Sequence, residues 1–435
     1  MTISANRAAL VAVLTASFCL AACERPEPAG QAAALPTGYW QAAISLPGAA
    51  IETGIEISRD GDVYRASLIN GQERVRIDDV RYADGELLLR FAAFNNEIRA
   101  TLVDGRLSGE LTLIKRHGRA ETMPFAATPG SAAVQEAVPH TRYDLSGRWA
   151  VRFHEPDGTD THSIGEFSQR GTRLFGTFLN PDGDHRFLAG HVRGNEFHLS
   201  TFDGAHAFVF SGFVDEAGEI VNADFWSGTS WHQLWSARRD NDVQLPDAFS
   251  RTWLKPGYER FEFEFPDQDG NIVSLADDRY RGKVVLVTIA GTWCPNCNDE
   301  ARYLARFHDT LRSEGLEVVA LLFEHFEDAD LAAEQVRLFR AKHGIGYDTL
   351  IAGISDKEVA SKTLPALSAV LAFPTTLFID RSGRVRHIHT GFSGPGTGDH
   401  YVRLQETFRQ LVTDLLAEPP NLLDSLIGDD PLDPI

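Results

Sequence analysis

Two cysteines stand three positions apart in the stretch TWCPNC, residues 292–297, of a chain that has four cysteines among its 435 residues. Thiols at this spacing can do three kinds of chemistry. They can form a structural disulfide, supply half of a zinc site, or cycle between dithiol and disulfide as a redox pair. The surrounding sequence has to distinguish these possibilities.

The pair lies where a buried strand is expected to end and a helix to begin. The apolar run KVVLVTIA, residues 283–290, predicts a central strand. The stretch NDEARYLARFHDTLRSEG, residues 298–315, predicts a helix, because its apolar residues recur on one face and a glycine ends it. Pro295 fits between the two elements, since the first helical turn has no amide partner to lose.

This placement favours redox chemistry. Free N–H groups and the positive end of the helix dipole stabilise a thiolate, so we expect Cys294 to be the nucleophile. Cys297, one turn further on, is placed to attack a mixed disulfide and release the product. Zinc would need two further ligands, and this part of the chain offers only His387 and His389, on one expected strand. A structural disulfide across so short a loop would stabilise little.

The N-terminus has the features of an export signal. Arg7 precedes an apolar stretch, residues 8–22, that is too short for a typical membrane span. It leads into LAAC, residues 20–23, which resembles the lipobox of bacterial lipoproteins. The resemblance implies cleavage before Cys23 and attachment of lipid to its sulfur. An ordinary signal peptide, cut after a small residue, is the alternative.

Export would determine which cysteines remain as free thiols in the mature protein. Cys19 would leave with the signal and Cys23 would carry lipid, so Cys294 and Cys297 would be the two free thiols of the mature protein. Outside the reducing cytosol, disulfides can persist. The formal net charge of −20 argues against a nucleic-acid partner, because binding to phosphates needs a basic surface.

The residues between 37 and about 240 read as short strands separated by turns. Alternating apolar and polar residues are interrupted by Asp-Gly and Asn-Gly pairs, which predicts an antiparallel barrel or sandwich. A weak repeat runs through this region, since Gly38-Tyr39-Trp40 is echoed by Gly147-Arg148-Trp149. We expect a non-catalytic tandem region that spaces the redox domain from the membrane, docks a partner or shields the active site.

From about residue 258 the pattern alternates between strands and helices, which predicts an α/β domain with a central mixed sheet flanked by helices. Residues 258–417 resemble the thioredoxin fold, and more closely the TlpA/ResA-like thiol-disulfide oxidoreductases. The matching segments are GKVVLVTIAGTWCPNC at 282–297, Glu300 three residues after the second cysteine, and FPTTLFIDRSGRV at 373–385. A helix inserted before the last of these segments also fits that family.

The resemblance implies roles for several residues near the cysteines. Pro374 would be a cis proline facing the pair, and Phe373 before it would contact the substrate. Trp293 would shield the sulfurs. Cytosolic thioredoxins have a buried aspartate where this chain has Thr288, so a proton relay would run elsewhere, through Glu300 or Glu324.

These observations predict the following division of the chain: a lipoprotein signal peptide (1–22), a flexible tether (23–36), two β units (37–130 and 142–240), a thioredoxin-like redox domain (258–418) and a disordered acidic tail (419–435).

The predicted function is that of an envelope thiol-disulfide oxidoreductase, anchored by lipid and facing the periplasm. It would reduce disulfides of exported proteins through a redox disulfide between Cys294 and Cys297, with no cofactor or metal. Its electrons would come from a membrane thiol-redox protein. Two alternatives remain open. One is a ligand-binding or assembly lipoprotein with a redox-sensing cysteine pair. The other is a thiol peroxidase, although the sequence AGTWC lacks the proline that peroxiredoxins have before their reactive cysteine.

Overall fold

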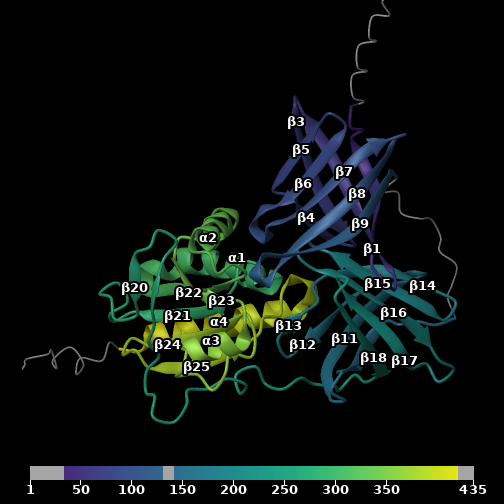
Figure 1. The fold of residues 1–435 in the computed structure, drawn as a ribbon. Helices are drawn as coiled ribbons and strands as arrows, with labels where there is room; N and C mark the ends of the chain where they lie inside the picture. The colour runs from purple at the N-terminus through teal and green to yellow at the C-terminus, as the bar shows by residue number, and fades with distance from the viewer. Residues whose placement is uncertain (1–33, 131–141, 420–435) are drawn as a thin grey trace, which may run out of the picture.

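The computed structural model describes residues 34–130 and 142–419 (Figure 1). The expected signal peptide, Cys23 and nearly all of the tether lie outside the described residues. The same holds for residues 131–141, between the two β units, and for residues 420–435 of the expected acidic tail.

The first β unit is a single antiparallel sheet of nine strands, in the order β4-β3-β2-β1-β9-β8-β7-β6-β5. The sheet curls without closing. Its strands are β1 (Gly38–Ser45), β2 (Ala50–Asp60), β3 (Val63–Asn70), β4 (Glu73–Arg76), β5 (Asp79–Ala83), β6 (Glu86–Phe91), β7 (Asn96–Val103), β8 (Arg106–Lys115) and β9 (Arg119–Pro129), with 3-10 turns η1 (Ala92–Phe94) and η2 (Arg116–Gly118).

The second β unit is a closed barrel. Each of eight strands pairs with two neighbours, because β10 pairs with both β11 and β18 and β11 also pairs with β12. A short strand, β13, extends from β12. The strands are β10 (Gly147–His154), β11 (Asp160–Arg170), β12 (Arg173–Asn180), β13 (Gly183–Asp184), β14 (Leu188–Arg193), β15 (Glu196–Phe202), β16 (Ala207–Val214), β17 (Ile220–Ser227) and β18 (Trp231–Arg239).

The repeat in the sequence corresponds to a shared structural feature. Trp40 in β1 and Trp149 in β10 are each 1% exposed. Each indole N–H donates to the carbonyl oxygen four residues earlier, on Pro36 at 3.1 Å and on Leu145 at 2.9 Å. The two tryptophans therefore occupy equivalent buried positions near the starts of β1 and β10. The units nevertheless differ, because the first remains an open sheet whose core also takes in Phe202 of the barrel.

The C-terminal unit has the mixed sheet that the sequence predicts, in the order β23-β22-β21-β24-β25. Strands β21, β22 and β23 are parallel, whereas β24 and β25 run antiparallel to their neighbours. The strands are β21 (Val284–Ala290), β22 (Leu316–Glu324), β23 (Asp348–Ile354), β24 (Thr375–Ile379) and β25 (Val385–Thr390), with a hairpin of β19 (Glu264–Pro266) and β20 (Ile272–Ser274) beside them.

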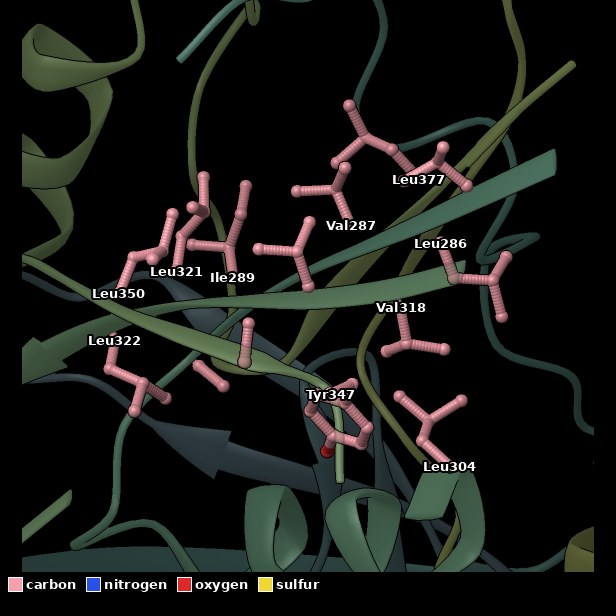
Figure 2. Close-up of a cluster of buried hydrophobic side chains, with 14 of the residues drawn as sticks. Leu286, Val287, Ile289, Leu304, Val318, Leu321, Leu322, Tyr347, Leu350 and Leu377 are labelled. Atoms are coloured by element: carbon pink, nitrogen blue, oxygen red, sulfur yellow. The ribbon is translucent and has the colours of Figure 1, made fainter. Parts of the chain in front are cut away.

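Helices cover this sheet, and two of them begin at aspartate caps. Asp328 caps α2 (Ala329–His343) and Asp356 caps α3 (Lys357–Thr363), and each carboxylate accepts two backbone N–H groups. The other helical segments are α1 (Pro295–Leu311), α4 (Asp399–Ala417) and the 3-10 turns η3 (Arg312–Glu314) and η4 (Pro395–Thr397). Their apolar faces meet the continuous apolar strands in the core shown in Figure 2, where Leu304 of α1 lies near Val318 of β22.

The two β units lie together beside the C-terminal unit (Figure 1). The turn η2 of the first unit reaches the end of β22, where the N–H of His117 donates to the carbonyl oxygen of His325 at 2.8 Å. Asp182 of the second unit pairs with Lys357 at 2.7 Å. Both units of the all-β region thus contact the redox domain. Within residues 34–130 and 142–419, no helix is both long enough and apolar enough to cross a membrane.

Substitution of Trp149 tests whether this buried side chain stabilises the barrel. Trp149→Phe should destabilise the protein by about 1–3 kcal/mol, because it removes a buried hydrogen bond and leaves a small cavity. Trp231→Phe is the matched control, since Trp231 is 44% exposed. Urea unfolding followed by circular dichroism measures both variants. Equal midpoints for the two would show that Trp149 has no special role.

Candidate active site

Cys294 and Cys297 lie at the junction between β21 and α1, as the sequence predicts. Cys294 is the N-cap of α1, and its Sγ accepts a hydrogen bond from the backbone N–H of Cys297 at 3.2 Å. Both residues are free thiols. The end of the central strand therefore presents the first sulfur at the helix N-terminus, where backbone N–H groups stabilise a thiolate.

The two sulfurs have different surroundings. Cys294 is 6% exposed and Cys297 is 1% exposed. Burial raises the pKa of the Cys297 thiol well above its usual range, and its hydrogen bond to Cys294 and the charge of Cys294 raise it further. Cys297 is thus protonated at neutral pH and is shielded behind Cys294.

The residues that the resemblance assigned to the site surround the cysteines. The peptide bond between Phe373 and Pro374 is cis, which confirms that expectation. The carbonyl oxygen of Phe373 lies 3.3 Å from Cys294 Sγ. Trp293 donates from its indole to the carbonyl oxygen of Phe323 at 2.8 Å, stacks on His325 and meets Phe373 edge to face.

Glu300 is buried beneath the cysteines. It is 1% exposed, and its carboxylate accepts hydrogen bonds from the hydroxyl groups of Thr288 at 2.5 Å and Thr376 at 2.6 Å. Burial raises the pKa of Glu300 to about 7. Its charge contributes to the raised pKa of Cys297. A buried acid therefore stands close to the second thiol, held in part by the threonine found where cytosolic thioredoxins have aspartate.

Glu324 is a second buried acid, at the end of β22. Its carboxylate accepts from the backbone N–H of Thr292 at 3.0 Å and from the Thr292 hydroxyl at 2.6 Å. Burial raises the pKa of Glu324 to about 7. Glu324 thus supports the turn that carries Trp293 and Cys294, whereas Glu300 lies on the side of Cys297.

Sequence reasoning missed several polar residues of the site. Asn298 donates to the carbonyl oxygens of Thr292 and Cys294 at 2.8 and 2.9 Å. Asp184 and Arg186 reach the start of α1 from the second β unit. No spacing signal in the chain links residues 184–186 to residues 294–299, so only the folded structure reveals this contact. Among residues 34–130 and 142–419, no cluster of three or more potential metal ligands occurs.

The C-terminal part of the chain is similar to known proteins. Residues 256–388 match the model of the AhpC/TSA family. Thiol-disulfide oxidoreductase ResA from Geobacillus kaustophilus (strain HTA426) is 30% identical over 141 residues, which are 32% of this chain and 72% of that protein. Thioredoxin-like protein YneN from Bacillus subtilis (strain 168) is 28% identical over 138 residues, or 32% of this chain and 73% of YneN.

Solved structures are also similar. One is a secreted thiol-disulfide isomerase from Corynebacterium glutamicum, with a TM-score of 0.31 and 17% sequence identity. That match covers 40% of this chain and 97% of the isomerase.

The unequal burial of the two thiols predicts an order of modification. In the reduced protein at pH 7, iodoacetamide should label Cys294 well before Cys297, because Cys297 is more buried and its thiol pKa is raised. Peptide mass spectrometry over a time course measures both rates. Cys294→Ser serves as a control in which labelling should become slow. Faster labelling of Cys297 in the unsubstituted protein would reverse the assignment of the nucleophile.

Proposed function

We propose that this chain, which belongs to the ResA-like thiol-disulfide oxidoreductases, reduces disulfides of exported proteins through Cys294 and Cys297. The observation that carries the proposal is the paired arrangement at the start of α1. Cys294 lies at the helix N-cap, and Cys297 lies behind it near a carboxylic acid with a pKa of about 7. This arrangement supplies a nucleophile, a resolving thiol and a base.

The first half-reaction forms a mixed disulfide. The Cys294 thiolate attacks one sulfur of the substrate disulfide, a bond forms between the two sulfurs, and the substrate's other sulfur leaves as a thiolate that takes a proton from solvent. The helix N-terminus stabilises the attacking thiolate. Phe373 and Pro374 border the sulfur that reacts.

The second half-reaction releases the substrate. Cys297 must lose its proton before it can attack, and the Glu300 carboxylate is the nearby group whose pKa allows it to accept a proton near neutral pH. The Cys297 thiolate then attacks Cys294 Sγ, and the second substrate sulfur leaves as a thiolate. Two electrons pass to the substrate and the cysteine pair becomes a disulfide. An external dithiol donor, which we propose to be a membrane thiol-redox protein, restores the pair.

The export signal and lipobox expected at the N-terminus motivate the proposed location, at the envelope and facing the periplasm. One modified sulfur with two or three acyl chains would give stable anchoring to a membrane. The all-β region would then lie between the anchor and the redox domain, in contact with the turn that carries the cysteine pair.

Thiol peroxidase activity is the second candidate, because residues 256–388 match the AhpC/TSA family model. A peroxidase would be oxidised at Cys294 by peroxide, with formation of a sulfenic acid and release of water, and Cys297 would resolve it to the disulfide. The same pair serves both reactions, so the substrate of the first step distinguishes them.

Trapping tests the proposed function. The Cys297→Ser protein should accumulate mixed disulfides with a reducible protein such as insulin, because the resolving thiol is missing, whereas Cys294→Ser should trap none. The unsubstituted, reduced protein should cleave insulin disulfides in many turnovers when dithiothreitol is supplied. Turnover with hydrogen peroxide but not with insulin would favour the peroxidase.

Substitution of the buried acid tests the proton relay. Glu300→Gln should slow the release of trapped substrate roughly 10- to 100-fold at pH 8, because no base near Cys297 remains. Glu324→Gln is the matched control, since Glu324 is equally buried but contacts Thr292. Equal slowing in both variants, measured by rapid quench and gel analysis, would remove Glu300 from the relay.

Although Glu300→Gln should slow the reaction, it should stabilise the folded protein at high pH. The folded state raises the pKa of Glu300 from 4.5 to about 7, so the carboxyl group keeps its proton longer when folded. Its contribution to stability is present below pH 4.5 and is lost as the pH rises through 7. Glu300→Gln, which stays neutral, should therefore gain up to about 3 kcal/mol relative to the unsubstituted protein at pH 8. Urea unfolding at pH 5 and pH 8 measures this difference, and a gain of equal size at both pH values would contradict it.

A further inference from the structure

We infer that the segment Gly183–Arg186 of the second β unit is part of the redox active site, with Asp184 as a positioning residue for the cysteine pair. Arg186 fixes that segment in place. The inference rests on the proposed redox role of Cys294 and Cys297. It extends that role by placing a residue of the all-β region next to the reacting loops.

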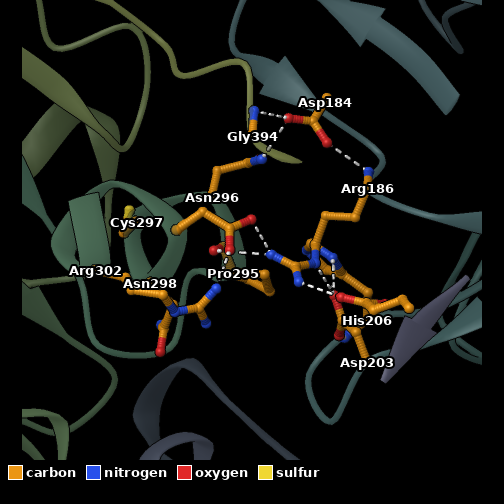
Figure 3. Close-up of polar contacts among 12 residues, drawn as sticks. Asp184, Arg186, Asp203, His206, Pro295, Asn296, Cys297, Asn298, Arg302 and Gly394 are labelled. Carbon is orange, nitrogen blue, oxygen red and sulfur yellow. Dashed lines mark hydrogen bonds and ion pairs between the residues drawn. The ribbon is translucent and has the colours of Figure 1, made fainter. Parts of the chain in front are cut away.

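Asp184 joins the two loops that flank the cysteines (Figure 3). One oxygen of its carboxylate accepts a hydrogen bond from the side-chain amide of Asn296, which lies between the two cysteines, at 3.1 Å. The same oxygen accepts from the backbone N–H of Gly394 at 2.6 Å. The other oxygen accepts from the backbone N–H of Arg186 at 2.6 Å. A single buried carboxylate therefore ties the first turn of α1 to the loop after β25.

The loop after β25 is itself connected to the cis proline. The N–H of Gly391 donates to the carbonyl oxygen of Pro374 at 2.9 Å. A Cβ atom on Gly391 would lie 2.9 Å from the carbonyl oxygen of Pro181, so the second β unit lies directly against this loop. A change at Asp184 would thus reach both the cysteine turn and the proline that borders it.

Arg186 holds the Asp184 segment against α1. Its guanidinium pairs with Asp299 of α1, with Asp203 of the barrel at 3.0 Å and with Glu73 of the first β unit at 2.5 Å. It also donates to the carbonyl oxygen of Pro295, between the cysteines, at 3.4 Å. The arginine and its three carboxylate partners all have side chains less than 10% exposed. The position of Asp184 is therefore set by a buried ionic cluster and not by a loose surface loop.

One physical effect of Asp184 favours the disulfide form of the pair. By tying down the first turn of α1, Asp184 keeps the sulfurs pre-organised for bond formation, and loss of that order weakens the disulfide. Removal of Asp184 should therefore stabilise the dithiol relative to the disulfide.

An amide cannot replace the carboxylate here. All three groups that face Asp184 are N–H donors, and a carboxylate accepts on both oxygens. In Asp184→Asn one side becomes an NH2 group that faces a donor, so either Arg186 or the pair of Asn296 and Gly394 loses its acceptor. Asp184→Asn changes few atoms but breaks the hydrogen-bonded connection that Asp184 makes.

The test is the redox equilibrium of the full-length protein with glutathione. In Asp184→Asn the equilibrium constant should shift about tenfold toward the dithiol, which corresponds to about 30 mV for a two-electron couple. Iodoacetamide should label Cys294 several-fold faster. Asp182→Asn is the matched control. Asp182 pairs with Lys357 and Arg251 near the same interface but contacts neither Asn296 nor Gly394 through its side chain, so its equilibrium constant should stay within twofold of the unsubstituted protein.

Asn296→Ala removes the hydrogen bond between Asn296 and Asp184 from the side of the redox domain. It should shift the redox equilibrium in the same direction by a smaller factor. The double variant should shift less than the product of the two single effects, because the residues share one hydrogen bond. If circular dichroism shows that Asp184→Asn does not fold, the result for Asn296→Ala alone tests the inference. An unchanged equilibrium and labelling rate in the folded variants, or equal shifts in Asp184→Asn and Asp182→Asn, would overturn the inference.

Failure of the proposed function would look different. In that case the unsubstituted protein would not equilibrate with glutathione at all, although the labelling rates of Cys294 would still report on Asp184. If the unsubstituted protein equilibrates normally and Asp184→Asn has the same redox equilibrium and labelling rate, only the positioning role of Asp184 is rejected.

Discussion

One buried arginine joins the three parts of this molecule. Arg186 brings its positive charge to a point where carboxylates from the first β unit, the barrel and the redox helix converge (Figure 3). Removing these charges from water costs free energy, and their mutual attraction offsets that cost only when the geometry is good. Removing the arginine alone would leave Glu73, Asp203 and Asp299 buried without the cation that they share. The cluster therefore favours the arrangement in which the redox helix lies against both β units.

The chemistry of the cysteine pair depends on burial. Burial raises the pKa values of Glu300 and Glu324 to about 7 and that of Cys297 above its usual range. If Glu300 and Glu324 were exposed to water, their pKa values would not be raised, and neither acid would change its charge near neutral pH. The thiol of Cys297 would also be less shielded from solvent.

Much of the redox domain could be predicted from the sequence because its signals are local. The strand before Cys294, the proline after it and the apolar face of α1 specify the active-site turn within about thirty residues. The cis bond at Pro374 followed from family resemblance. Other features depend on contacts between distant residues. Glu300 was recognised by its spacing from Cys297, but its partner Thr376 lies 76 residues away. Asp184 and Arg186 follow a Pro-Asp-Gly sequence that indicates only a turn, although Asp184 lies in β13. The tandem repeat could not show that one unit closes into a barrel while the other stays open.

We propose that Cys294 and Cys297 form a reversible two-electron couple within the intact protein. The most direct measurement equilibrates the full-length protein with a series of dithiothreitol buffers of known potential, quenches with acid and maps the cysteines by mass spectrometry. We expect a single transition with two-electron slope, in which a disulfide between residues 294 and 297 replaces two thiols. Thiols that persist in the most oxidising buffer, or cysteines that carry only separate adducts, would contradict it.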